Sequence, residues 1–257
     1  MSISKNRHFW CCEADVGSLD RLVLETILPR AGRLYPLAEI SLMALVVDRV
    51  RPTHIFEWGT NVGASAKLFH VLTEALGMDT SIHTWDLPDN VSHGQHPGAE
   101  HGKLAQGLPR VQFHREDGLV GALAEYQRVK SSHPEARVLF FIDGDHAYDS
   151  VLREITAIVS GLEEFHLLAH DTFVQKPEAK GQFRESWLAC ATGLELSARE
   201  YRWLNVGFGS PGMTYLWGKG KRQEKAGFRK HWLALLDRVE TRLEKIIHRS
   251  VAKLRGR

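Results

Sequence analysis

The apolar run Val138–Ile142 is the feature that most constrains how this chain can fold. It contains no polar side chain, and Asp143-Gly144-Asp145-His146 follows it at once. Such a run is typical of a central strand in a parallel sheet, where helices cover both faces. It therefore predicts an α/β fold in which polar groups end a buried strand.

Around this run, short β-rich segments alternate with patterns of helical periodicity, which is typical of βαβ units. Strands are expected at residues 54–57, 81–86, 111–115, 137–143 and 165–170. Helices are expected between them at residues 64–76, 119–129 and 148–160. Two further strands, at 201–206 and 213–217, flank a glycine-rich segment and predict a hairpin.

The 257 residues fit one large domain with short helical additions. We expect an N-terminal helical segment at 1–50, with helical periodicity at 20–28 and 37–50, then a main domain at 51–220 and a C-terminal helix at 221–257. No apolar stretch is long enough to span a membrane, and the first residues lack the apolar core of a secretory signal. Three cysteines give no framework of pairs, so we expect a cytoplasmic protein.

The C-terminal segment carries a concentrated basic charge. From Lys219 to Arg257 there are thirteen Lys or Arg and four Asp or Glu, whereas the whole chain has a net charge of +2. Apolar residues recur there at three- and four-residue steps, which predicts one amphipathic helix. Three roles are open for it: packing on the main domain, pairing in a homodimer, or lying on an anionic membrane surface with Phe228 and Trp232 as anchors.

The segment Glu57-Trp58-Gly59-Thr60-Asn61-Val62-Gly63-Ala64-Ser65 joins the first expected strand to its helix. Glycines at such a junction let the backbone turn tightly and approach a ligand, and the helix N-terminus offers unpaired N–H groups. The three-glycine pattern of dinucleotide-binding folds is absent, and an acid at the strand end suits phosphate poorly. The turn therefore favours a zwitterionic or cationic ligand, such as the methionine part of S-adenosylmethionine (SAM).

Two further acids follow strands of the expected sheet. Asp86 ends the second strand, where an acid in a doubly wound fold accepts hydrogen bonds from ribose hydroxyls. Asp117 follows the third strand, where an acid can approach an adenine amino group. Each has a plain structural alternative: Asp86 as a turn or capping residue, and Asp117 as the N-cap of the next helix.

Titratable side chains also end the fourth and fifth expected strands. Asp143, Asp145 and His146 follow the apolar run, and His170 and Asp171 end the next strand. Ligands of open α/β sheets bind outside the carboxyl ends of the strands, so these residues lie where chemistry is expected. Exposure to solvent alone does not readily explain why both strands end in histidine and aspartate side chains.

The segments EWGTNVGAS, FIDGDHAYDSVLREI and LLAHDTF together resemble bacterial class I SAM-dependent methyltransferases, in the branch with the rhamnosyl, macrocin-type and cephalosporin-hydroxylase-type enzymes. The resemblance covers roughly residues 50–218, and IDGDH-x-Y is its most specific motif. It implies a doubly wound, Rossmann-like sheet of seven strands with an antiparallel last strand. The SAM-binding residues that we expect are Glu57, Gly59, Asn61, Gly63, Ser65, Asp86, Asp117 and Asp143.

Several members of this broader group hold a divalent metal between acids at the fourth and fifth strand ends, which implies Mg²⁺ at Asp143 and Asp171. Thr172 departs from the catechol-type pattern, in which an Asp-Asn pair ends the fifth strand. His170 stands where some relatives have Glu, whereas Mg²⁺ prefers oxygen ligands. For a hydroxyl nucleophile, His146 is the expected base and His170 is the alternative, with Asp143 beside them.

The absence of certain motifs limits the class of molecule that can accept the methyl group. The Asn/Asp-Pro-Pro-Tyr/Phe motif of enzymes that methylate amino groups of DNA bases is absent, and no cysteine follows a proline as in cytosine C5 enzymes. We therefore expect O-methylation of a sugar, a glycan or another small natural product, and not of nucleic acid. Two other functions stay open: a catalytically idle binding subunit and a nicotinamide-dependent oxidoreductase. A lipid-linked acceptor would place the protein at the inner face of the membrane.

Overall fold

A computed structural model describes residues 19–88, 91, 98–172, 186, 189–194, 201–206 and 211–219. Their centre is a seven-stranded sheet in the order β3-β2-β1-β4-β5-β7-β6. β7 runs antiparallel to both of its neighbours, whereas the other pairings are parallel. The strands are β1 (His54–Trp58), β2 (Ser81–Asp86), β3 (Val111–Arg115), β4 (Val138–Ile142), β5 (Glu164–His170), β6 (Tyr201–Val206) and β7 (Met213–Lys219). The expected doubly wound sheet with an antiparallel last strand is therefore confirmed.

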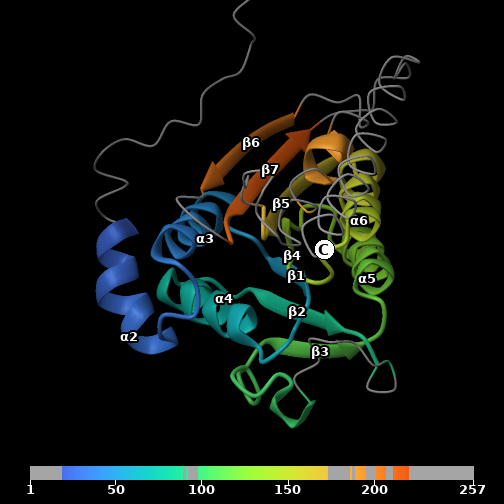
Figure 1. Ribbon diagram of the computed structural model, residues 1–257. Helices are drawn as coiled ribbons and strands as arrows, with labels where there is room; N and C mark the ends of the chain where they lie inside the picture. The colour runs from blue at the N-terminus through green and yellow to red at the C-terminus, as the bar shows by residue number, and fades with distance from the viewer. Residues whose placement is uncertain are drawn as a thin grey trace, which may run out of the picture.

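Helices cover both faces of the sheet (Figure 1). On one face lie η1 (Leu22–Ile27), α2 (Leu28–Ala31), α3 (Leu37–Val50) and α4 (Ala64–Ala75), and on the other lie α5 (Gly118–Ser132) and α6 (Tyr148–Gly161). Two separate hydrophobic clusters result, and successive residues of β4 belong to different ones: Phe141 packs on the α3–α4 side and Phe140 on the α5–α6 side. Because both of its faces are covered, β4 needs an apolar residue at every position.

The helices differ from expectation mainly at their ends. The expected helix at 20–28 becomes a π-helical turn, η1, followed by the short helix α2, which accepts Pro29 in its first turn. Helix α5 begins one residue earlier than expected, because the Asp117 side chain caps it by accepting a 3.0 Å hydrogen bond from Val120 N. A short turn, η2 (Gly98–Glu100), lies between β2 and β3.

The basic C-terminal helix expected at 221–257, with Phe228 and Trp232, lies outside the described residues, as do Cys11 and Cys12. Within the described part of the chain, every helix is too short or too polar to cross a bilayer.

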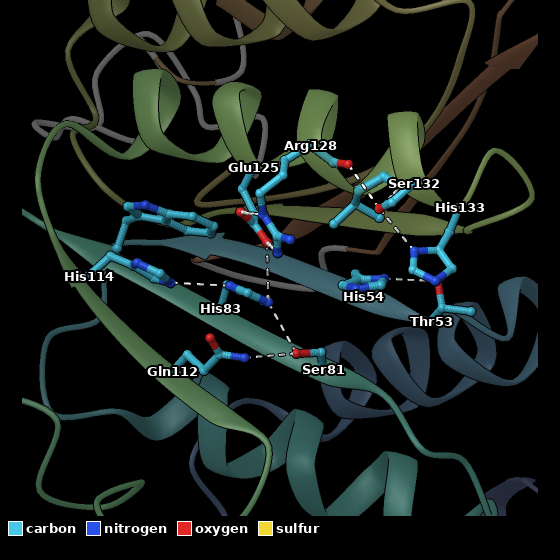
Figure 2. A network of polar contacts seen from close by, with 12 residues as sticks. Thr53, His54, Ser81, His83, Gln112, His114, Glu125, Arg128, Ser132 and His133 are labelled. Atoms are coloured by element: carbon cyan, nitrogen blue, oxygen red, sulfur yellow. Dashed lines mark hydrogen bonds and ion pairs between the residues drawn. The ribbon is translucent and has the colours of Figure 1, made fainter.

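A histidine ladder, formed by His54, His83 and His114, lies under α5 on strands β1, β2 and β3 (Figure 2). His83 Nδ1 lies 3.1 Å from His114 Nε2, and the two rings stack with their centroids 5.3 Å apart. Glu125 of α5 faces His83 at 4.0 Å. Burial lowers the pKa of His83 from 6.5 to about 4 and also lowers the pKa values of His54 and His114. Burial therefore disfavours the charged form of all three imidazoles.

Candidate active site at the carboxyl edge of the sheet

A cavity of about 520 Å³ opens where β1, β2, β3 and β4 end, beside the point at which the chain reverses direction across the sheet. Its size is that of a small-molecule site. The lining includes six residues expected from the sequence: Gly59, Asn61, Asp86, Asp117, Asp143 and His146. It also includes residues that the sequence did not single out, among them Trp58, Trp85, Leu87, Ser150, Arg153 and Glu154.

The turn after β1 depends on backbone conformations with positive φ. Gly59 has a φ of 99° and Gly63 has a φ of 82°, and Asn61 between them has a φ of 44°. Gly59 and Asn61 line the cavity, whereas Gly63 packs against the backbone of Gly102 and Ala105. The turn therefore presents its first half to a ligand and uses its second half for packing.

Asp86 lies at the end of β2, with its carboxylate fixed on three sides. Its Oδ2 accepts hydrogen bonds from Asn61 N at 3.1 Å and His101 Nε2 at 2.9 Å, and its Oδ1 accepts one from Leu87 N at 2.9 Å. His101 lies between β2 and β3 and was not among the site residues expected from the sequence. A carboxylate held in this way has a fixed orientation toward the cavity that it lines.

Glu57 and Ser65 do not line the cavity. Glu57 is fully buried and its Oε1 accepts a hydrogen bond from Ser65 Oγ, which ties the end of β1 to the first turn of α4. Burial raises the pKa of Glu57 to about 8, although the Ser65 hydrogen bond opposes this. The Glu57 Oε2 atom has no hydrogen-bond partner among the described residues. Glu57 thus stabilises the turn through its hydrogen bond with Ser65 and does not face the cavity.

The lining of the cavity is rich in carboxyl groups. Asp117 caps α5 and forms a 2.9 Å ion pair with Arg153 of α6. Burial raises the pKa of Glu154, also on α6, to about 8. Five acids line the cavity, whereas Arg153 is the one Lys or Arg among the described lining residues.

His146 pairs with Asp171 beside the cavity. The distance from His146 Nε2 to Asp171 Oδ2 is 3.1 Å. Burial raises the pKa of Asp171 to about 6, even though the charges of His170 and His146 lower it. Asp171 has a φ of 55°, an uncommon conformation for a residue other than glycine, and such strain is often found at functional sites. Of the pair, His146 lines the cavity and Asp171 lies behind it.

His170 is held between two carboxylates. Its Nδ1 lies 2.9 Å from Asp143 Oδ1, and its Nε2 lies 3.0 Å from Glu39 Oε2. Burial on its own lowers the pKa of His170, but the charge of Asp143 and both hydrogen bonds raise it well above the usual value. Because a carboxylate only accepts, both ring nitrogens donate, and His170 is not placed to take a proton from a substrate. Tyr35 OH completes the group by donating to Asp143 Oδ2 at 2.9 Å.

Within the described part of the chain, Asp143, His170 and Asp171 are the group that could hold a metal ion, because each offers a ligand atom within 4.8 Å of the others. In this arrangement, however, hydrogen bonds engage both oxygens of Asp143 and both nitrogens of His170. Asp171 Oδ2 faces His146, and its Oδ1 lies 3.5 Å from His170 Nδ1. The donor set as arranged does not fit Mg²⁺, which prefers oxygen ligands free to turn toward it. The four side chains Asp143, His170, Asp171 and His146 instead hold one another through hydrogen bonds and ion pairs.

No family model and no curated protein matches the sequence. Among solved structures, the chain is similar to a protein from Klebsiella pneumoniae described as an O-methyltransferase, with 20% identity and a TM-score of 0.48 over 79% of this chain and 90% of that one. It is also similar to an O-methyltransferase from Bacillus cereus in complex with SAH, with 14% identity and a TM-score of 0.46 over 82% and 93%. A third similar structure is the O-methyltransferase TomG from Streptomyces achromogenes in complex with SAM, with 16% identity and a TM-score of 0.48 over 82% and 92%.

Proposed function

We propose that this protein is a SAM-dependent methyltransferase that methylates a hydroxyl of a small molecule. One observation carries the proposal: a single cavity joins the turn at Gly59, the fixed carboxylate of Asp86 and the His146–Asp171 pair. A nucleoside, a charged amino-acid part and a proton acceptor can therefore meet within one small-molecule site.

The end of β2 is suited to a nucleoside. Asp86 offers carboxylate oxygens to ribose hydroxyls, as acids at this position do in doubly wound folds. Leu87 follows it, lines the cavity and stays 36% exposed, so that it offers apolar surface to a flat base. Trp58 and Trp85 add further apolar surface to the same cavity.

The charge of the cavity supports SAM over a nicotinamide dinucleotide. SAM carries a positive sulfonium, a positive ammonium and one carboxylate, so that its net charge is positive and an acidic lining attracts it. A pyrophosphate would meet four aspartates and one arginine, and the three-glycine turn that usually binds it is absent. The acidic lining is therefore an argument against an oxidoreductase.

SAM, when bound, supplies a methyl group on a good leaving group. In the transfer, an oxygen–carbon bond forms as the carbon–sulfur bond breaks, and the electron pair of the broken bond stays on sulfur. The protein has to align the reacting groups, which can supply a large part of the acceleration, and to remove the hydroxyl proton. We assign that proton to His146, because Asp171 stabilises the imidazolium that results. Asp143 lines the cavity beside them and orients the reacting groups.

For the acceptor we propose a hydroxyl on a sugar, a glycan or another small natural product. This proposal rests on the missing motifs of base-methylating enzymes and on the histidine base, which an alcohol needs. Pairing of two chains and binding to an anionic membrane depend on residues 221–257, which are not among the described residues, and both stay predictions.

Two measurements test the proposed function. Calorimetric titration of the full chain should show one SAM bound per chain and no binding of NAD. Transfer of tritium from methyl-labelled SAM to a panel of sugars, glycans and small phenols should then identify the acceptor class. Binding of NAD without SAM would overturn the proposal. SAM binding without transfer to any hydroxyl compound would favour an idle binding subunit.

A further inference from the structure

Glu39 is a buried carboxylate on a helix that otherwise packs apolar side chains on the sheet. It lies in the first turn of α3, is 3% exposed, and is followed by the core residues Ile40 and Met43. Its Oε2 lies 3.0 Å from His170 Nε2, and its Oε1 accepts a 2.9 Å hydrogen bond from the backbone N of Gly212. Both oxygens are therefore used, and they join α3 to the end of β5 and to the turn before β7.

The contact continues from Glu39 into the cavity. His170 Nδ1 lies 2.9 Å from Asp143 Oδ1, and Tyr35 OH donates to the other oxygen, Oδ2, at the same distance of 2.9 Å. The rings of Tyr35 and His170 also meet edge to face, with their centroids 5.1 Å apart. Asp143 lines the cavity, and neither Glu39 nor His170 nor Tyr35 does. Both oxygens of Asp143 are thus fixed from behind by residues that do not line the cavity.

We propose that Glu39 and Tyr35 are positioning residues of the methyl-transfer site. Tyr35 holds the Asp143 carboxylate in its orientation directly, and Glu39 does so through His170. The inference rests on the proposed function. It assigns a role in the site to two residues of the N-terminal helical segment. Stability alone gives little reason for this cluster, because buried ion pairs are often no more stabilising than apolar residues of the same volume. A fixed orientation is what an aligned displacement requires, since small misplacements of reacting groups are costly.

The experiment uses the full chain with the variants Glu39→Gln, Tyr35→Phe and, as a matched control, Asp48→Asn. Glu39→Gln keeps the size of the side chain and removes its charge, and Tyr35→Phe removes one hydroxyl. Asp48→Asn removes the same charge from the same helix at a position whose partner is Arg51, 3.8 Å away. Downfield proton NMR detects hydrogen-bonded ring N–H protons of buried histidines. The carbon resonance of [methyl-¹³C]SAM reports the surroundings of the bound methyl group.

Wild type should show two protected ring N–H protons from His170. Glu39→Gln should shift or lose one of them, because one neutral amide oxygen replaces two carboxylate oxygens, whereas Asp48→Asn keeps both unchanged. The bound methyl resonance should move in Glu39→Gln and in Tyr35→Phe but not in Asp48→Asn, when each protein is saturated with SAM. An unmoved methyl resonance in both site variants would overturn the inference. If Glu39→Gln does not fold, Tyr35→Phe decides by the same resonance. A wild type that binds no SAM would overturn the proposed function instead, and the ring protons alone would then decide whether Glu39 holds His170.

Discussion

Gly59 and Asp143 pack so closely that a Cβ atom on Gly59 would lie 2.0 Å from the carbonyl oxygen of Asp143. The φ of Gly59, 99°, is also one that side chains with a Cβ rarely adopt. The ends of β1 and β4 therefore approach each other as only glycine allows. This contact sets the position of the turn relative to the residues that follow β4.

The substitution Gly59→Ala should remove SAM binding and destabilise the fold by about 3 kcal/mol or more, because the added methyl group meets rigid backbone. Gly77→Ala is the matched control: its φ is 64°, and no atom lies within 4 Å of a Cβ added there. It should cost about 1 kcal/mol of backbone strain and leave SAM binding intact. Denaturant titration and calorimetry measure both effects. Wild-type SAM affinity in Gly59→Ala would contradict the proposed position of the ligand.

Asp86→Ala should weaken SAM binding by about 1–3 kcal/mol, because ribose hydroxyls lose a fixed acceptor. Asp79→Ala is the control, since Asp79 has a side chain that is 95% exposed and is paired only loosely with Arg110 at 3.3 Å. Its SAM affinity, measured by the same calorimetric titration, should match wild type. Equal affinities in both variants would show that Asp86 serves the turn and not the ligand.

His146→Ala should lower kcat by a factor on the order of 10²–10⁴, the usual contribution of a general base. SAM affinity should change little, because His146 is assigned to the acceptor and not to SAM. The exposed His133 gives the control variant His133→Ala, which should keep full turnover. Initial rates with methyl-labelled SAM and the acceptor found in the panel measure the effect. A loss of SAM affinity that explained the whole rate change would argue against a base.

Methyl transfer should continue at its full rate in excess EDTA. The reason is that hydrogen bonds from Tyr35 and His170 already engage the oxygens of Asp143 in this arrangement. Rates before and after dialysis against chelator, with and without added Mg²⁺, check this. A rate that falls in chelator and returns with Mg²⁺ would show that the cluster opens to bind a metal.

Acid should destabilise the protein through the histidine ladder. The pKa of His83 is depressed in the folded state, from 6.5 to about 4. The unfolded chain therefore binds the proton first as the pH falls. The stabilisation is complete above pH 6.5 and is lost as the pH falls toward 4, by roughly 2 kcal/mol for this one residue. Urea unfolding of wild type and His83→Phe at pH 7.5 and pH 5 tests this, and the variant should lose less stability. A His133→Phe control that behaved like His83→Phe would assign the effect elsewhere.

The sheet and its polar edge could be predicted because their determinants are local. The apolar run of β4 specifies a strand covered on both faces, and the turn at Gly59 specifies its junction with α4. The bounds expected for β2 and β3 agree with the structure. Once the strands are parallel, their carboxyl ends meet at one edge, so that Asp86, Asp143 and His146 were expected together.

The orientation of the Glu57 side chain differs from the expectation that it faces the ligand. The sequence placed it at a strand end and therefore at the ligand, but successive residues of a strand point to opposite faces. Trp58 points into the cavity, so Glu57 points to the α4 side, where Ser65 bonds it. This distinction was available from the alternation of the strand.

No local sequence pattern indicated that Tyr35 and Glu39 contact the site. Tyr35 meets Asp143 across 108 residues, and Glu39 meets His170 across 131. An acid in an amphipathic helix normally faces water, and the packing of α3 against the sheet turns Glu39 inward. Such pairs follow from tertiary structure, which a single sequence does not state.

The place of β7 between β5 and β6 has a consequence for synthesis on the ribosome. Among the described strands, β7 is the one that pairs with β6 and with the outer edge of β5, so this edge of β5 stays open until residues 213–219 have emerged. Glu39, made long before, also waits for the N–H of Gly212. A nascent chain of this protein therefore carries an open, apolar strand edge and a buried acid that lacks one partner. Open edges of this kind invite pairing with other chains. Release of residues 213–219 is thus the step that covers that edge.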